Sequence, residues 1–166
     1  MRKLIVPGIY KHFKGKMYIA VAQSKPAKDI ENLKEVFHVL HTEKDVPVTI
    51  YEKDNEFVHD SNIDNGELAV YKSLYDDKAY ARPLPMFLSL RDKTKYPNYD
   101  QEYRMEFITT TDNENLRNAI SSTKELFNDY NDRFKTMTDE QKIRVGRSII
   151  VAQNSLINSI DLSFNK

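Results

Sequence analysis

The feature that most constrains the fold is a change in hydrophobic period near residue 108. Before it, short runs of β-branched and aromatic residues bounded by turn residues predict strands. The clearest of these runs are 17–21, 46–51, 68–71 and 102–108. After it, apolar residues follow a helical spacing. The sequence therefore predicts an α+β fold, in which a small antiparallel β-sheet or partly open barrel is followed by a C-terminal antiparallel helical hairpin.

The two predicted helices each begin with a capping signature. Thr111 stands three residues before Glu114, and Thr138 stands three residues before Gln141, which is the spacing of a capping box. A short connection joins the helices, so we expect residues 109–166 to fold back as a hairpin. The aliphatic stripe of the second helix is broad enough to pack on the chain's own sheet or to join copies of the chain. We expect a homo-oligomer, a dimer or higher, through residues 139–160.

The preceding part, residues 1–108, is expected to be a β-rich ligand-binding module. Its segment 22–65 is long and polar, and within it residues 29–37 predict a short helix. Two turns are expected, at 14–16 and at 64–66. The second is predicted because Asn and Gly adopt positive φ at low cost.

Composition excludes several classes of protein. Lys and Arg number 25, Asp and Glu also number 25, and the chain has no cysteine. Zero net charge argues against a protein that coats duplex DNA. The absence of cysteine removes disulfides, thiolate nucleophiles and thiolate metal sites. No apolar run reaches the length of ~20 residues that spans a bilayer, so we expect a cytoplasmic protein without a membrane partner.

No constellation of side chains indicates catalysis or metal binding. Four glycines are too few for the common phosphate-binding loops, and no serine lies in a nucleophile elbow. His38 and His41 lie three apart on a segment that reads as a strand, which points them to opposite faces. With His59 and Asp60 they make a conceivable metal set, but scattered surface histidines are the better interpretation. We expect no cofactor, no metal and no enzymatic activity.

An aromatic and basic set remains, at residues 10–16, 79–87, 95–98 and 103–104. Aromatic faces stack on bases, and guanidinium groups match phosphate oxygens in a bidentate way, so the set suits a ligand with flat rings and negative charge. The alternative is that the aromatics fill the core while the cations reach solvent. Taken alone, these residues favour the core.

The order of the motifs resembles a family of small bacterial and phage domains of unknown function. The matching segments are Tyr10-Lys11-His12-Phe13-Lys14-Gly15, Val70-Tyr71-Lys72-Ser73-Leu74-Tyr75, Arg82-Pro83-Leu84-Pro85-Met86-Phe87, Lys95-Tyr96-Pro97 and Gln101-Glu102-Tyr103-Arg104. Segment 22–65 is longer than in typical members and departs from the pattern as an insertion. A compact sheet followed by a helical hairpin also resembles the phage anti-Thoeris sponge proteins, which are oligomers that sequester cyclic ADP-ribose immune signals without degrading them.

This resemblance implies a non-enzymatic phage counter-defence protein in the host cytoplasm that binds a small cyclic nucleotide. Arg82 and Arg104 would contact pyrophosphate or ribose, Phe87 and Tyr96 would stack on a base, and Asn98 would donate directional hydrogen bonds. Tyr10, His12 and Lys14 are weaker candidates for the same site.

The substitutions Arg82→Ala and Phe87→Ala are expected to remove binding and to leave the stability of the free protein unchanged. The alternative is an RNA- or peptide-binding module that dimerises through its C-terminal helices. A third interpretation is an inhibitor whose helices occupy a groove of a host protein.

Overall fold

The computed structural model describes residues 2–74, 78–110, 114, 118, 121, 133, 136–144 and 147. The chain divides into two compact units, one of residues 1–73 and 78–107, the other of residues 74–77 and 108–166. The hairpin predicted over 109–166 lies mostly outside the described residues, as do Thr111 and most of the proposed 139–160 contact. Residues 139–144 are helical. The capping box before them is confirmed, because the Gln141 N–H donates to Thr138 Oγ1 (3.3 Å) and the Thr138 N–H donates to Gln141 Oε1 (3.0 Å).

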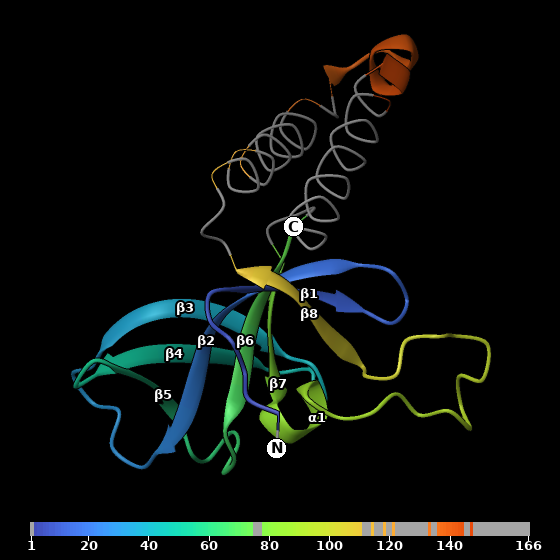
Figure 1. Ribbon diagram of the computed structural model, residues 1–166. Coiled ribbons are helices and arrows are strands. Elements are labelled where there is room, and N and C mark those ends of the chain that lie inside the picture. The colour runs from blue at the N-terminus through green and yellow to red at the C-terminus, as the bar shows by residue number, and fades with distance from the viewer. Residues whose placement is uncertain are drawn as a thin grey trace. The chain divides into compact units, whose positions relative to one another are not determined.

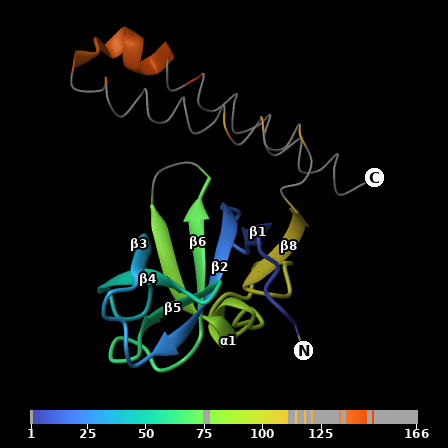
Figure 2. The same cartoon turned by 90° about the vertical axis from the view of Figure 1, so that its left-hand side faces the viewer.

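The first unit is built on a closed barrel of six strands, with two further strands beside it (Figures 1 and 2). Around the barrel the strands run β5-β4-β3-β7-β6-β2, and β2 pairs with β5 to close it. Strands β1 and β8 continue the sheet beyond β2. The elements are β1 (Gly8–His12), β2 (Met17–Ala27), β3 (Lys34–His41), β4 (Pro47–Lys53), β5 (Glu56–Asp60), β6 (Leu68–Ser73), β7 (Ala79–Pro83), α1 (Leu84–Phe87) and β8 (Met105–Thr110).

The predicted β-rich module is confirmed, and each of the four predicted strands overlaps an observed one, but the sheet is mixed rather than antiparallel. The β2–β5 and β3–β7 pairs are parallel. Closure depends on the length of β2, which pairs with β6 over Tyr18–Ser24 and with β5 over Ser24–Ala27. A β-bulge in β2 between Ala20 and Ala22 adds the bend that a small barrel requires.

The predicted helix at 29–37 is wrong. Asn32 has a φ of 63° and ends a turn, after which β3 begins at Lys34 and pairs with β4. Val36, Phe37 and Val39 favour a strand once a neighbouring strand is present to pack against. Segment 22–65 is therefore part of the barrel itself, since it contains β3, β4, β5 and the end of β2.

The two predicted turns are present, but positive φ occurs in the first and not in the second, for which it was expected. Gly15, in the β1–β2 turn, has a φ of 100°, which glycine adopts without a steric penalty. The 64–66 segment has no positive φ. It is held instead by the Gly66 N–H, which donates to Asp64 Oδ1 (2.8 Å), as in an Asx turn.

Strand β6 separates two hydrophobic clusters, because both of its faces are buried. Leu68 and Val70 face the barrel interior, and Ala69 and Tyr71 face a second cluster on the outer side of the wall. The second cluster also contains Tyr10, Ala20, Phe87 and Met105. A strand buried on both faces reads as a continuous apolar run, and this second face positions the candidate site.

Candidate functional site

A cleft of about 280 Å³ opens on the outer side of the barrel wall, next to the β1–β2 turn. Tyr71 on β6 and Arg82 on β7 reach it because their chain neighbours Val70 and Ala81 point into the barrel, and side chains alternate along a strand. The residues that line the cleft are His12, Lys14, Lys16, Tyr18, Tyr71, Arg82 and Met105.

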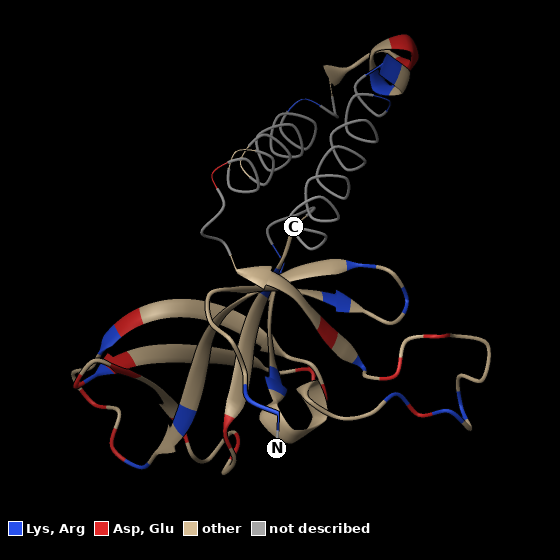
Figure 3. Ribbon diagram, viewed as in Figure 1, with Lys and Arg blue, Asp and Glu red and all other residues tan. Residues whose placement is uncertain are grey.

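The β1–β2 turn brings three nitrogen-bearing side chains to one side of the cleft. The His12 N–H donates to the Lys16 carbonyl (2.8 Å), and the Gly15 N–H donates to the His12 carbonyl (2.7 Å). The Lys14 N–H donates to His12 Nδ1 (3.1 Å). Figure 3 shows basic residues and no acidic ones on this hairpin, so an acid that offsets its charge must come from another element, as Glu56 of β5 does for Lys25.

Arg82 is placed by contacts on both of its sides. Its Nε donates to the Tyr71 hydroxyl (3.2 Å), and its Nη1 lies 3.5 Å from Glu43 Oε1. The Arg82 side chain is 16% exposed. Burial raises the pKa of Tyr71 and outweighs the opposing effect of the Arg82 charge, so the Tyr71 hydroxyl keeps its proton at neutral pH. Arg82 is thus a preorganised cation with five N–H donors, more than these contacts use.

Arg104 adds a second guanidinium from the segment before β8. Its backbone N–H donates to the Ser89 carbonyl (2.9 Å), and its carbonyl accepts from the Phe13 N–H (3.1 Å), which holds it against the hairpin. Its Nε is buried and has no hydrogen-bond partner within the described part of the chain. Buried donors are satisfied in the great majority of cases, so this nitrogen is an unusual feature of the segment before β8.

Burial and the surrounding cations both act on the His12 ring. Burial, followed by the positive charges of Arg82, Arg104 and Lys14, lowers the pKa of His12 to about 4. His12 is therefore neutral at physiological pH. The three cations disfavour a positive charge on the His12 ring, and for the same reason they favour an anion beside it.

The structure brings four of the eight predicted site residues together. His12, Lys14 and Arg82 line the cleft, and Arg104 lies near enough to act on His12 electrostatically. The other four are Phe87, Tyr10, Tyr96 and Asn98, and they have different positions.

Phe87 and Tyr10 are core residues, so the prediction that they contact a ligand is wrong. Their exposures are 0% and 1%. The Phe87 ring packs edge-on against Tyr10, with centroids 5.1 Å apart, and against Tyr71, 5.2 Å apart. The helical turn α1 directs Phe87 inward, and together these rings support Tyr71, which does line the cleft.

Tyr96 lies beside the hairpin rather than in the cleft lining. Its ring packs on Phe13, with centroids 4.9 Å apart, and the Lys14 ammonium is 4.9 Å from its centroid. The buried Arg91 holds this loop, because its guanidinium donates to the Tyr96 carbonyl. Asn98 is exposed in the same loop and is not among the described residues that line the cleft.

The sequence-based assignment missed Lys16, Tyr18, Tyr71 and Met105. Tyr18 and Tyr71 fall in two of the predicted strands, and their alternation with barrel-interior residues was a usable signal. Which of the two faces carries a cleft depends on the pairing of β2, β6 and β7, which the alternation does not specify.

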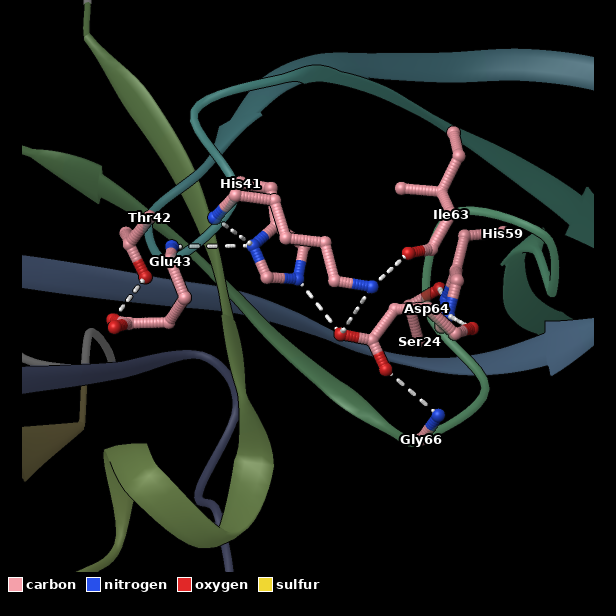
Figure 4. Close-up of polar contacts among 9 residues, drawn as sticks. Ser24, His41, Thr42, Glu43, His59, Ile63, Asp64 and Gly66 are labelled. Carbon is pink, nitrogen blue, oxygen red and sulfur yellow. Dashed lines mark hydrogen bonds and ion pairs between the residues drawn. The ribbon is translucent and has the colours of Figure 1, made fainter.

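A separate cluster of polar residues is buried between β2, β3 and the β5–β6 loop (Figure 4). Ser24 Oγ and His59 Nδ1 are 2.7 Å apart, and His59 Nε2 is 3.0 Å from the Asp64 carbonyl oxygen. His41 Nε2 donates to Asp64 Oδ2 (2.7 Å), and His41 Nδ1 accepts from the N–H groups of Glu43 and Lys44 (both 3.2 Å).

This cluster does not have the geometry of a catalytic triad. His59 bonds to the backbone of Asp64 and not to its carboxylate, whereas a triad needs the carboxylate to orient the base. Ser24, His41 and His59 are each 0% exposed, so a substrate would not reach the hydroxyl. The cluster joins strands of the barrel.

The histidines differ from expectation in their burial. His41 and His59 are internal, so the interpretation of them as surface residues is wrong. His38 is exposed, which confirms that His38 and His41 face opposite ways. No group of three or more metal-ligating side chains occurs among the described residues. None of the helices that the structure describes is long and apolar enough to cross a membrane.

Comparisons of the chain with family models, with curated proteins and with solved structures find no match.

Proposed function

We propose that the chain binds a phosphate-bearing nucleotide in the cleft beside the β1–β2 turn and releases it unchanged. The observation that carries this proposal is a cleft that Lys14, Lys16 and Arg82 line together with His12, with the charge of Arg104 also acting on His12. Phosphate oxygens are the acceptors that guanidinium groups match best, because two N–H donors can bond to two oxygens at once.

The charge of the cleft indicates a ligand with more than one negative charge. Lys14, Lys16, Arg82 and Arg104 supply four positive charges, and Glu43 beside Arg82 offsets one of them. The remaining three positive charges exceed the two negative charges of a pyrophosphate diester or of two phosphodiester groups, so either would be attracted. The Tyr18 and Tyr71 rings add an apolar wall.

The size of the cleft and its surroundings suit a nucleotide that is only partly enclosed. A volume of about 280 Å³ lies at the lower end of small-molecule sites. It accommodates the phosphate-bearing part, while the rest of the ligand extends over the hairpin toward Tyr96. Together with the resemblance to sponge proteins, this favours a cyclic ADP-ribose-type signal as the ligand and sequestration in counter-defence as the role.

A binding role without catalysis agrees with the state of His12. Its Nδ1, the ring nitrogen that could take a proton, already accepts from the Lys14 N–H (3.1 Å). General base catalysis needs a free acceptor near the reacting group. Sequestration needs only affinity, which preorganised cations supply.

The test is a thermal-shift and calorimetric screen against cyclic ADP-ribose isomers, ADP-ribose, cyclic dinucleotides and a short RNA. A ligand of the folded state raises the melting temperature by mass action. Arg104→Met should weaken binding at least tenfold, and heating the complex should return intact ligand. Conversion to a linear product would indicate an enzyme. Preference for RNA, with an affinity that falls steeply with salt, would favour the RNA-binding alternative.

Lys25→Gln is the matched control, because it removes one positive charge seven residues beyond Tyr18 on β2. Lys25 is half exposed and pairs with Glu56, so this substitution should leave nucleotide binding unchanged. An equal loss in Lys25→Gln and Arg104→Met would show that overall charge, and not the cleft, determines affinity.

We also propose that the chain forms a homo-oligomer through residues 139–160. Of this segment the structure describes 139–144 and 147, and Ile143 is 58% exposed there. A contiguous exposed apolar patch marks a contact surface, and Ile143 belongs to the apolar stripe that the sequence predicts for this segment. Light scattering should give a mass above 19.5 kDa for the wild type and a lower mass for Ile143→Asp.

A further inference from the structure

We propose that His12 binds the anion as an uncharged donor through Nε2–H, with its tautomer fixed by the backbone N–H of Lys14. This inference rests on the proposed function, since it assigns one residue's role in the same cleft. The tautomer follows from geometry. His12 Nδ1 accepts the Lys14 N–H at 3.1 Å, so in the neutral ring the proton is on Nε2. His12 lines the cleft, and the β1–β2 turn holds it there.

The cations that disfavour protonation of His12 come from several elements of the fold. Lys14 and Lys16 belong to the same turn, and Arg82 projects from β7. Arg104 precedes β8, and burial adds to the effect of the charges. Tyr18, Tyr71 and Met105 complete the lining, and Glu43 lies against Arg82 rather than in the lining. Protonation of the ring would also break the bond from Lys14.

This arrangement has a consequence for the pH dependence of binding. A histidine that binds phosphate as a cation loses affinity as the pH rises through 6 to 7. A neutral donor does not titrate in that range, so the affinity should be constant from pH 5.5 to pH 8. The fixed cations supply the charge, and His12 supplies direction. The cleft thus holds its ligand equally well across the pH range of a cell.

Asparagine and glutamine separate the two nitrogens of the ring. His12→Asn places an amide oxygen near the position of Nδ1, so it retains the acceptor for Lys14 and loses the donor at Nε2. His12→Gln places an amide nitrogen near Nε2, so it retains the donor and loses the acceptor. For a ligand-binding role through Nε2, the Gln variant should bind better than the Asn variant, and a merely structural role predicts the reverse order.

The experiment measures ADP-ribose binding by calorimetry, because the pyrophosphate of this probe stays ionised from pH 5.5 to pH 8. We expect a constant wild-type dissociation constant, about tenfold weaker binding by His12→Asn, and a smaller loss in His12→Gln. Nitrogen-15 NMR of the His12 ring should show the Nε2–H tautomer in the free and the bound protein. Melting temperatures identify a variant that fails to fold. In that case the NMR spectrum of the wild type tests whether His12 is the neutral Nε2–H tautomer in the complex.

The outcomes separate the two proposals. Wild-type affinity that falls across pH 6 to 7, a protonated ring in the complex, or His12→Asn binding as well as wild type would overturn the role of His12 and leave nucleotide binding intact. If wild type binds no ADP-ribose and none of the screened nucleotides, the proposed function fails and this inference fails with it.

Discussion

Truncation of Phe87 tests whether the aromatic part of the sequence motif serves the core or the ligand. Phe87 is 0% exposed, and its ring contacts Tyr10 and Tyr71 at centroid distances of 5.1 and 5.2 Å. Phe87→Ala removes this buried ring and leaves a cavity, which costs about 3–5 kcal/mol of the free energy of unfolding. Small domains have only about 5–15 kcal/mol in total, so the loss is a large share.

The expected shift in melting temperature follows from the size of the first unit, which has about 100 residues. At about 4–8 °C per kcal/mol for a domain of this size, a loss of about 3–5 kcal/mol should make Phe87→Ala melt roughly 12–40 °C below wild type. Phe87→Leu preserves most of the volume and should lose only about 1–1.5 kcal/mol. Leu90→Ala, three residues further on, is the control, because Leu90 is 56% exposed and its truncation should change stability by about 0.5 kcal/mol or less.

Binding is measured on Phe87→Leu, which stays folded. Its dissociation constant for the nucleotide found in the screen should remain within about threefold of wild type, because the ring does not reach the cleft surface. The reasoning is refuted if Phe87→Ala melts within about 3 °C of wild type and has lost nucleotide binding. That result would place the ring against the ligand, as the motif alone suggested.

Three further predictions concern acid, the polar cluster and the cleft. Burial lowers the pKa of His59, and burial with nearby cations lowers that of His12 to about 4, both from 6.5. The unfolded chain then binds more protons below pH 6.5, so the unfolding free energy of the ligand-free protein should fall from pH 6.5 to pH 4 in urea titrations. A flat profile would contradict this. Asp64→Ala should destabilise the protein by roughly 2–3 kcal/mol in the same assay, because it leaves buried His41 without its acceptor; a loss below about 0.5 kcal/mol would show that the contact is dispensable. Tyr71→Phe should weaken nucleotide binding about threefold to tenfold with little loss of stability, because Arg82 loses the hydroxyl that orients it, and calorimetry that finds unchanged affinity would exclude a positioning role.

The pKa of Asp64 illustrates how the polar cluster responds to acid. Burial alone would raise it, but the Gly66 N–H, the His41 bond and the charge of Lys44 together lower it. The carboxylate therefore stays ionised well below neutral pH, and its contribution to stability is present above pH 3.8 and lost below it. Acid sensitivity between pH 6.5 and pH 4 should come from the histidines and not from Asp64.

Local patterns predicted those parts of the chain whose structure is set by near neighbours. Segments 68–71 and 17–21 predicted strands that became β6 and β2, because β-branched and aromatic residues favour the extended backbone of a sheet. The Thr138 capping box formed as expected, since its partners are three residues apart. The opposite orientation of His38 and His41 likewise follows from the two-residue period.

The same patterns failed where distant segments decide. Residues 29–37 have the composition of a short helix, but pairing with β4 made most of the segment a turn and a strand. Phe87 and Tyr10 have the chemistry of a stacking platform, and packing against Tyr71 buried both.

By itself the sequence determined that residues 1–108 are β-rich, that the chain has no cysteine chemistry, and that its unusual side chains are aromatic and basic. Only the tertiary structure decided which of them share a surface. His12, Arg82 and Arg104 come from three segments far apart in the chain, and the strand order β7-β6-β2-β1-β8 places those segments in one sheet. The sequence specifies the chemistry of each side chain. A binding site also depends on the distances between segments, and these are set by the folded backbone.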